Sequence, residues 1–187
     1  APAFHSAGAS LVSAEYRGYG SSTGSPSARG LIADAPVVLD HVIAFLKERG
    51  HTGPLVVMGR SMGSAPAIEL ASTRGRDIAG LIVESGFART EPLLALFGIS
   101  LESLGLRDLS GMDNEDKMAD VRMPVLVLHA EGDVLRPPWN GERIHERAAS
   151  DEKNLVMIPN ADHNTIMALG GSLYQDAIAE FLAMVGK

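Results

Sequence analysis

A serine at the centre of Gly59-Arg60-Ser61-Met62-Gly63 is the residue of this chain best suited to nucleophilic chemistry. The pentapeptide matches G-x-S-x-G, and it lies between the apolar run Leu55 to Met58 and a helical pattern from Met62 to Arg74. Between a strand and a helix this pattern forms a sharp turn that exposes the serine hydroxyl, and glycine on either side lets the two elements approach. The turn also places the N–H of Met62 at a helix N-terminus, where it can donate to an oxyanion. We predict Ser61 as nucleophile and Met62 as oxyanion donor; the alternative is a packing turn of small residues.

Of the six histidines, His163 is the best placed to act as the base that a serine nucleophile needs. It lies in Pro159 to Asn164, a loop directly after the last predicted strand. The C-terminal ends of parallel strands share one edge, where ligands bind in open α/β sheets, so we expect His163 to lie on the same edge as Ser61. The alternative is a loop histidine with a capping role. The other five lie in predicted helices, in connecting segments or at a strand end: His5, His41, His51, His129 and His145.

The base in turn needs a carboxylate to orient it, and Asp133 is our first candidate. It follows the strand that ends at His129, and Gly132 permits a turn that returns the next side chain toward the site. Glu131 is the second candidate and Glu84, at the end of the preceding strand, the third. The alternative for Asp133 is a turn residue of the Asx type ahead of two prolines. The order Ser61, Asp133, His163 is the one expected for a triad on an α/β-hydrolase sheet.

Short apolar runs alternate with helical patterns along the chain, which predicts βα units packed on a parallel sheet. The runs are almost continuous in Val, Ile and Leu, which favours strands covered on both faces. Five strands are predicted: 9–15, 55–58, 81–84, 125–129 and 154–158. Four helices are predicted, the first from Leu31 to Leu46 with Gly50 as its stop signal and the others over 62–74, 142–149 and 172–185.

The stretch from Phe87 to Val121 is too long for an ordinary connection between a strand and the next element. Apolar residues and then an acidic run predict one or two short amphipathic helices there. The insertion either completes the core or forms a small lid over an apolar pocket. In the second case we expect three of its side chains to contact substrate: Leu93, Leu94 and Phe97.

Length and charge exclude several classes of function. A chain of 187 residues with 45% hydrophobic residues can bury one core, and we expect one domain over 1–187. A net charge of −7 gives no basic surface for nucleic acid, and no apolar run is long enough for a membrane span. Zero cysteines exclude thiolate ligands, and the histidines lack the spacing of a metal site. We therefore expect a small-molecule partner and neither metal nor cofactor. The cysteine count does not determine the compartment, and a cytoplasmic location is a prior expectation only.

Four segments resemble the α/β-hydrolase superfamily, in particular its Bem46-like and dienelactone-hydrolase-like serine hydrolases with small lids. They are the turn Tyr16 to Gly24, the nucleophile turn Met58 to Ser64, the acid loop His129 to Asp133 and the histidine loop Ala161 to Asn164. The resemblance spans nearly the whole chain in order. It implies a three-layer α/β-hydrolase fold with a mostly parallel sheet and helices on both faces, and a triad of Ser61, Asp133 and His163.

The resemblance also implies missing elements, because family members carry three strands and a His-Gly loop ahead of the turn at Tyr16. We therefore predict an N-terminally truncated fold without the loop that supplies the second oxyanion donor. Tyr16 and Arg17 are candidates for that donor or, alternatively, hold their own loop. The gap in the sheet could close by direct pairing of 9–15 with 55–58 or by strand exchange in a homodimer, and a fragment of a longer protein is the interpretation that we favour.

These residues predict a serine hydrolase of carboxylic esters or thioesters that works through an acyl-enzyme. The alternative from another class is a catalytically weak or inactive fragment that serves as an interaction module. A third hypothesis is an enzyme with a different reaction, namely that of an aminopeptidase, lyase or perhydrolase, because a fold does not determine a reaction.

Overall fold

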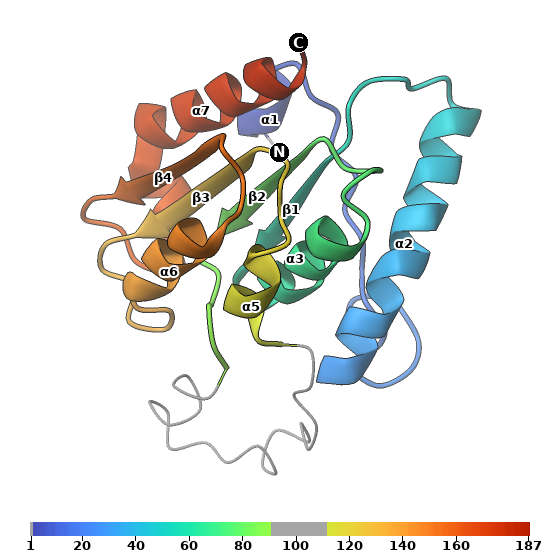
Figure 1. The fold of residues 1–187 in the computed structure, drawn as a ribbon, viewed down its shortest axis with the longest axis horizontal. Helices are drawn as coiled ribbons and strands as arrows, with labels where there is room; N and C mark the ends of the chain where they lie inside the picture. The colour runs from blue at the N-terminus through green and yellow to red at the C-terminus, as the bar shows by residue number, and fades with distance from the viewer. Residues whose placement is uncertain (1, 91–111) are drawn as a thin grey trace.

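In the part of the chain that the structure describes, four parallel strands form one sheet and follow one another in chain order (Figure 1). The computed structural model describes residues 2–90 and 112–187. The strands are β1 Val56–Arg60, β2 Gly80–Glu84, β3 Val125–Ala130 and β4 Lys153–Ile158. Each pairs with the next in parallel. This confirms the α/β class and the last four predicted strands, and it brings the C-terminal ends of all four to one edge.

Helices cover both faces of the sheet, as predicted. α1 Pro2–Ser6 and α7 Ile166–Val185 lie on one face, whereas α3 Ser64–Thr73, α5 Asn114–Met118 and α6 Trp139–Arg147 lie on the other (Figure 1). Successive residues of a strand point to opposite faces, so Ile82 and Leu126 pack under α7 while Leu81 and Val83 pack under α3. α2 Ala28–Glu48 packs against α3. The three layers of the predicted fold are therefore present.

Helix boundaries differ from the prediction where glycines interrupt the pattern. α7 begins at Ile166, ahead of the predicted start at Ser172, and it is kinked at Gly171, whose φ of 49° and ψ of −126° are not helical. The predicted helix from Met62 is divided into a 3₁₀ turn, η1 Ser61–Gly63, and α3. The short helix α1 was not predicted.

The predicted strand Ala9 to Glu15 is wrong. These residues belong to no strand, and in Figure 1 they lie within the coil between α1 and α2. Leu11 and Val12 are 47% and 45% exposed. Among the described strands β1 pairs only with β2, so direct pairing of this segment with β1 does not close the sheet. An apolar run becomes a strand only where a neighbour accepts its backbone hydrogen bonds.

The central part of the predicted insertion, with Leu93, Leu94 and Phe97, lies outside the described residues. The flanking residues are held together. The N–H of Glu115 donates to the Ala88 carbonyl at 3.1 Å, and the amide of Asn114 donates to the Phe87 carbonyl at 2.7 Å. α5 agrees with the expectation of a short helix in this insertion. Over residues 2–90 and 112–187, none of the helices has the length and hydropathy of a membrane-spanning segment.

Candidate active site

Ser61 is the first residue of η1 and lies in the strained turn that directly follows β1. Its φ is +51°, a left-handed value that residues with a side chain rarely adopt. Gly59 makes the turn possible, because a Cβ there would lie 2.3 Å from the Gly63 carbonyl oxygen and 2.7 Å from the Ala67 Cβ. The Ser64 hydroxyl donates to the Ser61 carbonyl at 2.7 Å. At Gly63, by contrast, a Cβ would meet no atom of the described chain within 4 Å, so only the first glycine is required by packing here.

The structure brings Ser61, His163 and Asp133 together in one hydrogen-bonded array. His163 Nε2 lies 2.9 Å from Ser61 Oγ, and its Nδ1 lies 2.7 Å from Asp133 Oδ2. His163 and Asp133 are buried and Ser61 is half-buried. An imidazole with Nδ1 on a carboxylate has its second nitrogen free to take the hydroxyl proton. The array can therefore carry out general-base activation of the serine.

Asp133 is held in place by its own loop as well as by His163. Its Oδ1 accepts the N–H groups of Leu135 and Arg136 at 3.0 and 2.7 Å. Gly132 brings the acid and histidine loops together: its N–H donates to the Ala161 carbonyl at 2.9 Å, and a Cβ would lie 2.8 Å from that oxygen. The other two candidates for the carboxylate that orients His163 do not take this position. Glu131 is exposed, and Glu84 accepts hydrogen bonds from Arg60 and Tyr174.

The loop that carries His163 is built around the preceding aspartate. Asp162 Oδ1 accepts the N–H groups of Asn164 and Thr165, both at 2.9 Å, and the Thr165 hydroxyl at 2.7 Å. These donors, the Thr165 hydroxyl first and the backbone groups next, lower the pKa of Asp162. The turn therefore fixes the backbone on the C-terminal side of His163, immediately before α7.

A second network, which the sequence reasoning missed, reaches the backbone of His163 itself. Arg60 Nη2 donates to the His163 carbonyl at 2.5 Å, and its Nε donates to Glu84 Oε1 at 2.8 Å. The other Glu84 oxygen accepts the Tyr174 hydroxyl at 2.5 Å. Arg60 and Glu84 are the last residues of β1 and β2 and are register partners, whereas the predicted strand 55–58 stopped two residues before Arg60 and gave no signal for this pair. Nothing in the sequence pointed to Tyr174.

The predicted oxyanion and loop residues occupy different surroundings. Met62 lies in η1, in the first turn ahead of α3, where N–H groups lack intrahelical acceptors. Arg17 binds Asp34 of α2 through two nitrogens, which fits a role in holding its own loop. Burial and, less strongly, Asp34 raise the pKa of Tyr16. Among the described residues, neither Tyr16 nor Arg17 hydrogen-bonds to the array.

Comparison with known proteins identifies the family. The model of the family described as "Serine aminopeptidase, S33" matches residues 1–105, more than half of the chain. The chain belongs to this family of the α/β-hydrolase superfamily. The α/β hydrolase is 31% identical over 181 residues to the alpha/beta hydrolase domain-containing protein WAV2 of Arabidopsis thaliana. The aligned region covers 89% of this chain and 58% of WAV2.

Two further similarities concern proteins whose names state an activity. The α/β hydrolase is 30% identical over 163 residues to the lysophosphatidylserine lipase ABHD12 of Danio rerio, covering 79% of this chain and 41% of that protein. An esterase of Pyrococcus furiosus has the same fold, with a TM-score of 0.72, 17% identity and coverage of 91% of this chain and 68% of the esterase. The chain thus spans about three fifths of WAV2 and two fifths of ABHD12.

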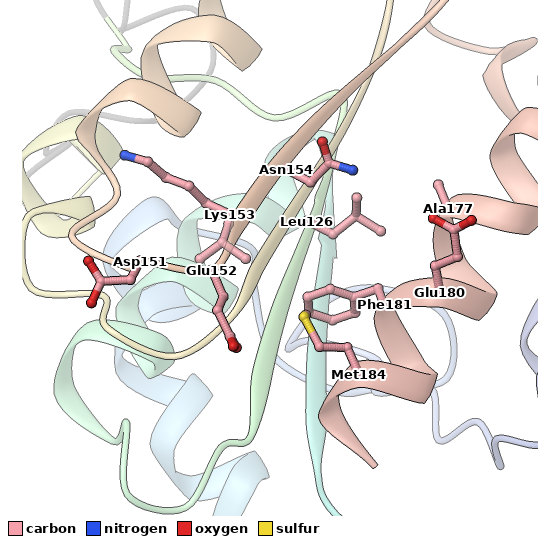
Figure 2. A pocket seen from close by; sticks show the side chains of 10 residues that line it. Leu126, Asp151, Glu152, Lys153, Asn154, Ala177, Glu180, Phe181 and Met184 are labelled. Carbon is pink, nitrogen blue, oxygen red and sulfur yellow. The ribbon is translucent and has the colours of Figure 1, made fainter. Parts of the chain in front are cut away.

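One cavity of this α/β hydrolase lies away from the array. It has a volume of about 320 Å³ and is located between the N-terminal ends of β3 and β4 and the last turns of α7. Ser61, Asp133 and His163 all follow C-terminal strand ends, at the opposite edge of the sheet. Figure 2 shows that apolar side chains line this cavity, with acidic side chains around them. The labelled lining residues are Leu126, Asp151, Glu152, Lys153, Asn154, Ala177, Glu180, Phe181 and Met184.

His129 of the α/β hydrolase is buried beside the acid loop and gives folding a pH dependence. Its Nε2 lies 2.7 Å from the Arg136 carbonyl, whereas its Nδ1 has no hydrogen-bond partner among the residues that the structure describes. Burial lowers the pKa of His129, and the hydrogen bond to Arg136 and the charge of Asp133 oppose the shift less strongly. The unfolded chain therefore binds a proton that the folded protein excludes, and stability falls as pH decreases below the ordinary value of 6.5.

We expect the unfolding midpoint in urea to be lower at about pH 5.5 than at about pH 7.5, and His129→Gln to reduce this difference. Gln retains a donor for the Arg136 carbonyl without a titrating ring. His51 is exposed in a loop, so His51→Gln is the control and should preserve the wild-type difference. An unchanged difference in His129→Gln would contradict the assignment.

Proposed function

We propose that this α/β hydrolase cleaves carboxylic ester or thioester bonds through an acyl-enzyme formed on Ser61. One observation carries the proposal: the continuous array from Ser61 Oγ through both nitrogens of His163 to Asp133, with steps of 2.9 and 2.7 Å. The strained φ of Ser61 supports it, because strain of this kind persists where the surrounding structure enforces it and clusters at functional sites.

In the proposed reaction, Ser61 Oγ attacks the acyl carbon while His163 Nε2 takes the hydroxyl proton. The carbonyl oxygen becomes an oxyanion, to which the Met62 N–H donates. When the intermediate collapses, the bond to the leaving alcohol or thiol breaks and His163 returns the proton to it. Water then repeats the sequence on the acyl-enzyme and releases the acid. Asp133 holds the imidazole and balances its positive charge in both steps.

The similarity to a lipase and an esterase supports acyl esters as the substrate class, whereas the family description names an aminopeptidase. Because the chain spans only part of these relatives, their substrates are hypotheses for it. We propose Leu93, Leu94 and Phe97 as contacts for an apolar acyl group. Three further predictions from the sequence stay predictions. They are strand exchange in a homodimer, a second oxyanion donor from Tyr16 or Arg17, and a cytoplasmic location.

Intact mass before and after treatment with a fluorophosphonate tests the proposal. We expect one stoichiometric adduct, which peptide mapping assigns to the peptide containing Ser61, because this reagent phosphonylates serines that are activated as nucleophiles. Turnover of a panel of esters, thioesters and aminoacyl amides then distinguishes the acyl chemistries. An adduct on another residue would refute the assignment of Ser61. The absence of any adduct would favour the alternative of an inactive interaction module.

A further inference from the structure

We propose that Arg60 is a positioning residue for His163, and that it ties the backbone of the histidine loop to the strand that carries Ser61. Its effect on catalysis rests on the proposed function, whereas its effect on the His163 side chain does not. Arg60 directly precedes Ser61 in the chain, and its guanidinium reaches the carbonyl of a residue 103 positions away. One side chain thus connects the two loops whose separation sets the distance between Oγ and Nε2.

The contacts of the guanidinium define this role. Nη2 donates to the His163 carbonyl at 2.5 Å while Nε donates to Glu84 Oε1 at 2.8 Å. A planar guanidinium presents several donors in a fixed fork, so that two acceptors held in place determine its orientation. A lysine ammonium is a point donor on a flexible stem and lacks this fixed geometry. The arrangement therefore requires arginine specifically.

Glu84 and Tyr174 fix the other end of the fork. The Glu84 side chain is 4% exposed, and its second oxygen accepts the Tyr174 hydroxyl at 2.5 Å. Burial first, and then the Glu84 carboxylate, raises the pKa of Tyr174 far above its ordinary value, so the hydroxyl keeps its proton and remains the donor. Tyr174 belongs to α7, which follows the histidine loop. The connection therefore closes on itself, from the loop to α7, Glu84, Arg60 and back to His163.

The Arg60 network fixes the backbone carbonyl of His163, which the other contacts of the array do not hold. Asp133 holds the imidazole at Nδ1, and Asp162 holds the turn after His163, but neither contacts the His163 carbonyl. The Arg60 side chain is 45% exposed, but the Glu84 side chain is 4% exposed. Loss of the guanidinium would leave that buried carboxylate with the Tyr174 hydroxyl as its remaining donor among the described residues, so we expect a loss of folding stability beside the effect on geometry. The His163 N–H signal and the split between kcat and KM separate the two roles, because a purely structural role would change neither in the folded protein.

The test compares Arg60→Met and Arg60→Lys with Arg74→Met in the purified protein. Arg74 is a matched control, because it also binds two acceptors, Asp40 and Asp77, and lies at the end of α3 away from the array. Proton NMR with ¹⁵N-histidine reports the imidazole N–H that bridges His163 and Asp133, assigned by its loss in His163→Gln. The rate of labelling by the fluorophosphonate and the values of kcat and KM for an ester report the effect on catalysis.

We expect Arg60→Met to broaden or shift the His163 N–H signal and to lower both kcat and the labelling rate by about 10- to 100-fold with KM nearly unchanged. Arg60→Lys should recover only part of the loss, and Arg74→Met should match the wild type. Where Arg60→Met does not fold, the lysine variant decides. A variant with lower stability but a wild-type signal and wild-type rates would overturn the proposal. A wild-type protein without labelling would refute the proposed function, and the NMR signal would still decide the role of Arg60.

Discussion

Replacing Ser61 by alanine is expected to lower kcat for ester hydrolysis about 10⁶-fold, down to the rate that binding and the oxyanion donor alone sustain. The substitution removes only Oγ, the atom 2.9 Å from His163 Nε2. Because alanine keeps Cβ, the backbone at φ +51° remains as strained as before, and we expect stability to change little. The rate of hydrolysis of a chromogenic ester, measured beside the thermal unfolding midpoint, checks both expectations.

Ser72→Ala is the matched control for this prediction. Ser72 lies in the last turn of α3, at the end of the helix away from the nucleophile turn, and its hydroxyl donates to the Glu69 carbonyl at 3.0 Å within the helix. Its loss should leave hydrolysis and labelling at wild-type levels. A Ser61→Ala protein that retained more than about a hundredth of the wild-type activity would show that another group performs the attack.

The fold was predictable where the local pattern and the tertiary environment agree. Ile82 and Leu126 lie in runs that are apolar at every position, because both faces of their strands are covered by helices. Segment 9–15 contains the apolar pair Leu11 and Val12 among alanines, serines and a glutamate, and it pairs with none of the described strands, so its short apolar pattern misled the prediction. Pairing is a property of two segments, and composition reports only one of them. The start of α7 was hidden for another reason, since Gly171 interrupts the helical pattern inside the helix.

The candidate site was predictable where function imposes a local motif. The turn at Ser61 and the loop at His163 carry short signatures, and the shared edge of the sheet explains why they meet. The partnership of Arg60 with Glu84 depends instead on the register between β1 and β2 and on the face to which both side chains point. Neither quantity can be derived from spacing along the chain, because one shift of register reverses every side chain of a strand.

Replacing Asp133 by asparagine is expected to lower kcat/KM about 10⁴-fold while the array keeps its geometry. The surroundings dictate how the new amide must lie. Two backbone donors, the N–H groups of Leu135 and Arg136, point at Oδ1 at 3.0 and 2.7 Å. An oxygen must therefore occupy that position, because an NH₂ group there would face two donors and leave them unsatisfied in a buried site.

The amide nitrogen of the variant then faces His163 Nδ1, where it can only donate. The imidazole responds by carrying its proton on Nε2, the nitrogen beside Ser61, and it has no lone pair left with which to accept the hydroxyl proton. Kinetics of ester hydrolysis would show a loss in kcat with KM almost unchanged, and labelling by the fluorophosphonate would slow in parallel. Glu131→Gln makes the same chemical change at an exposed carboxylate two residues away and should leave both rates intact. Comparable losses in the two variants would mean that general electrostatics of the loop, and not the tautomer of His163, controls the reaction.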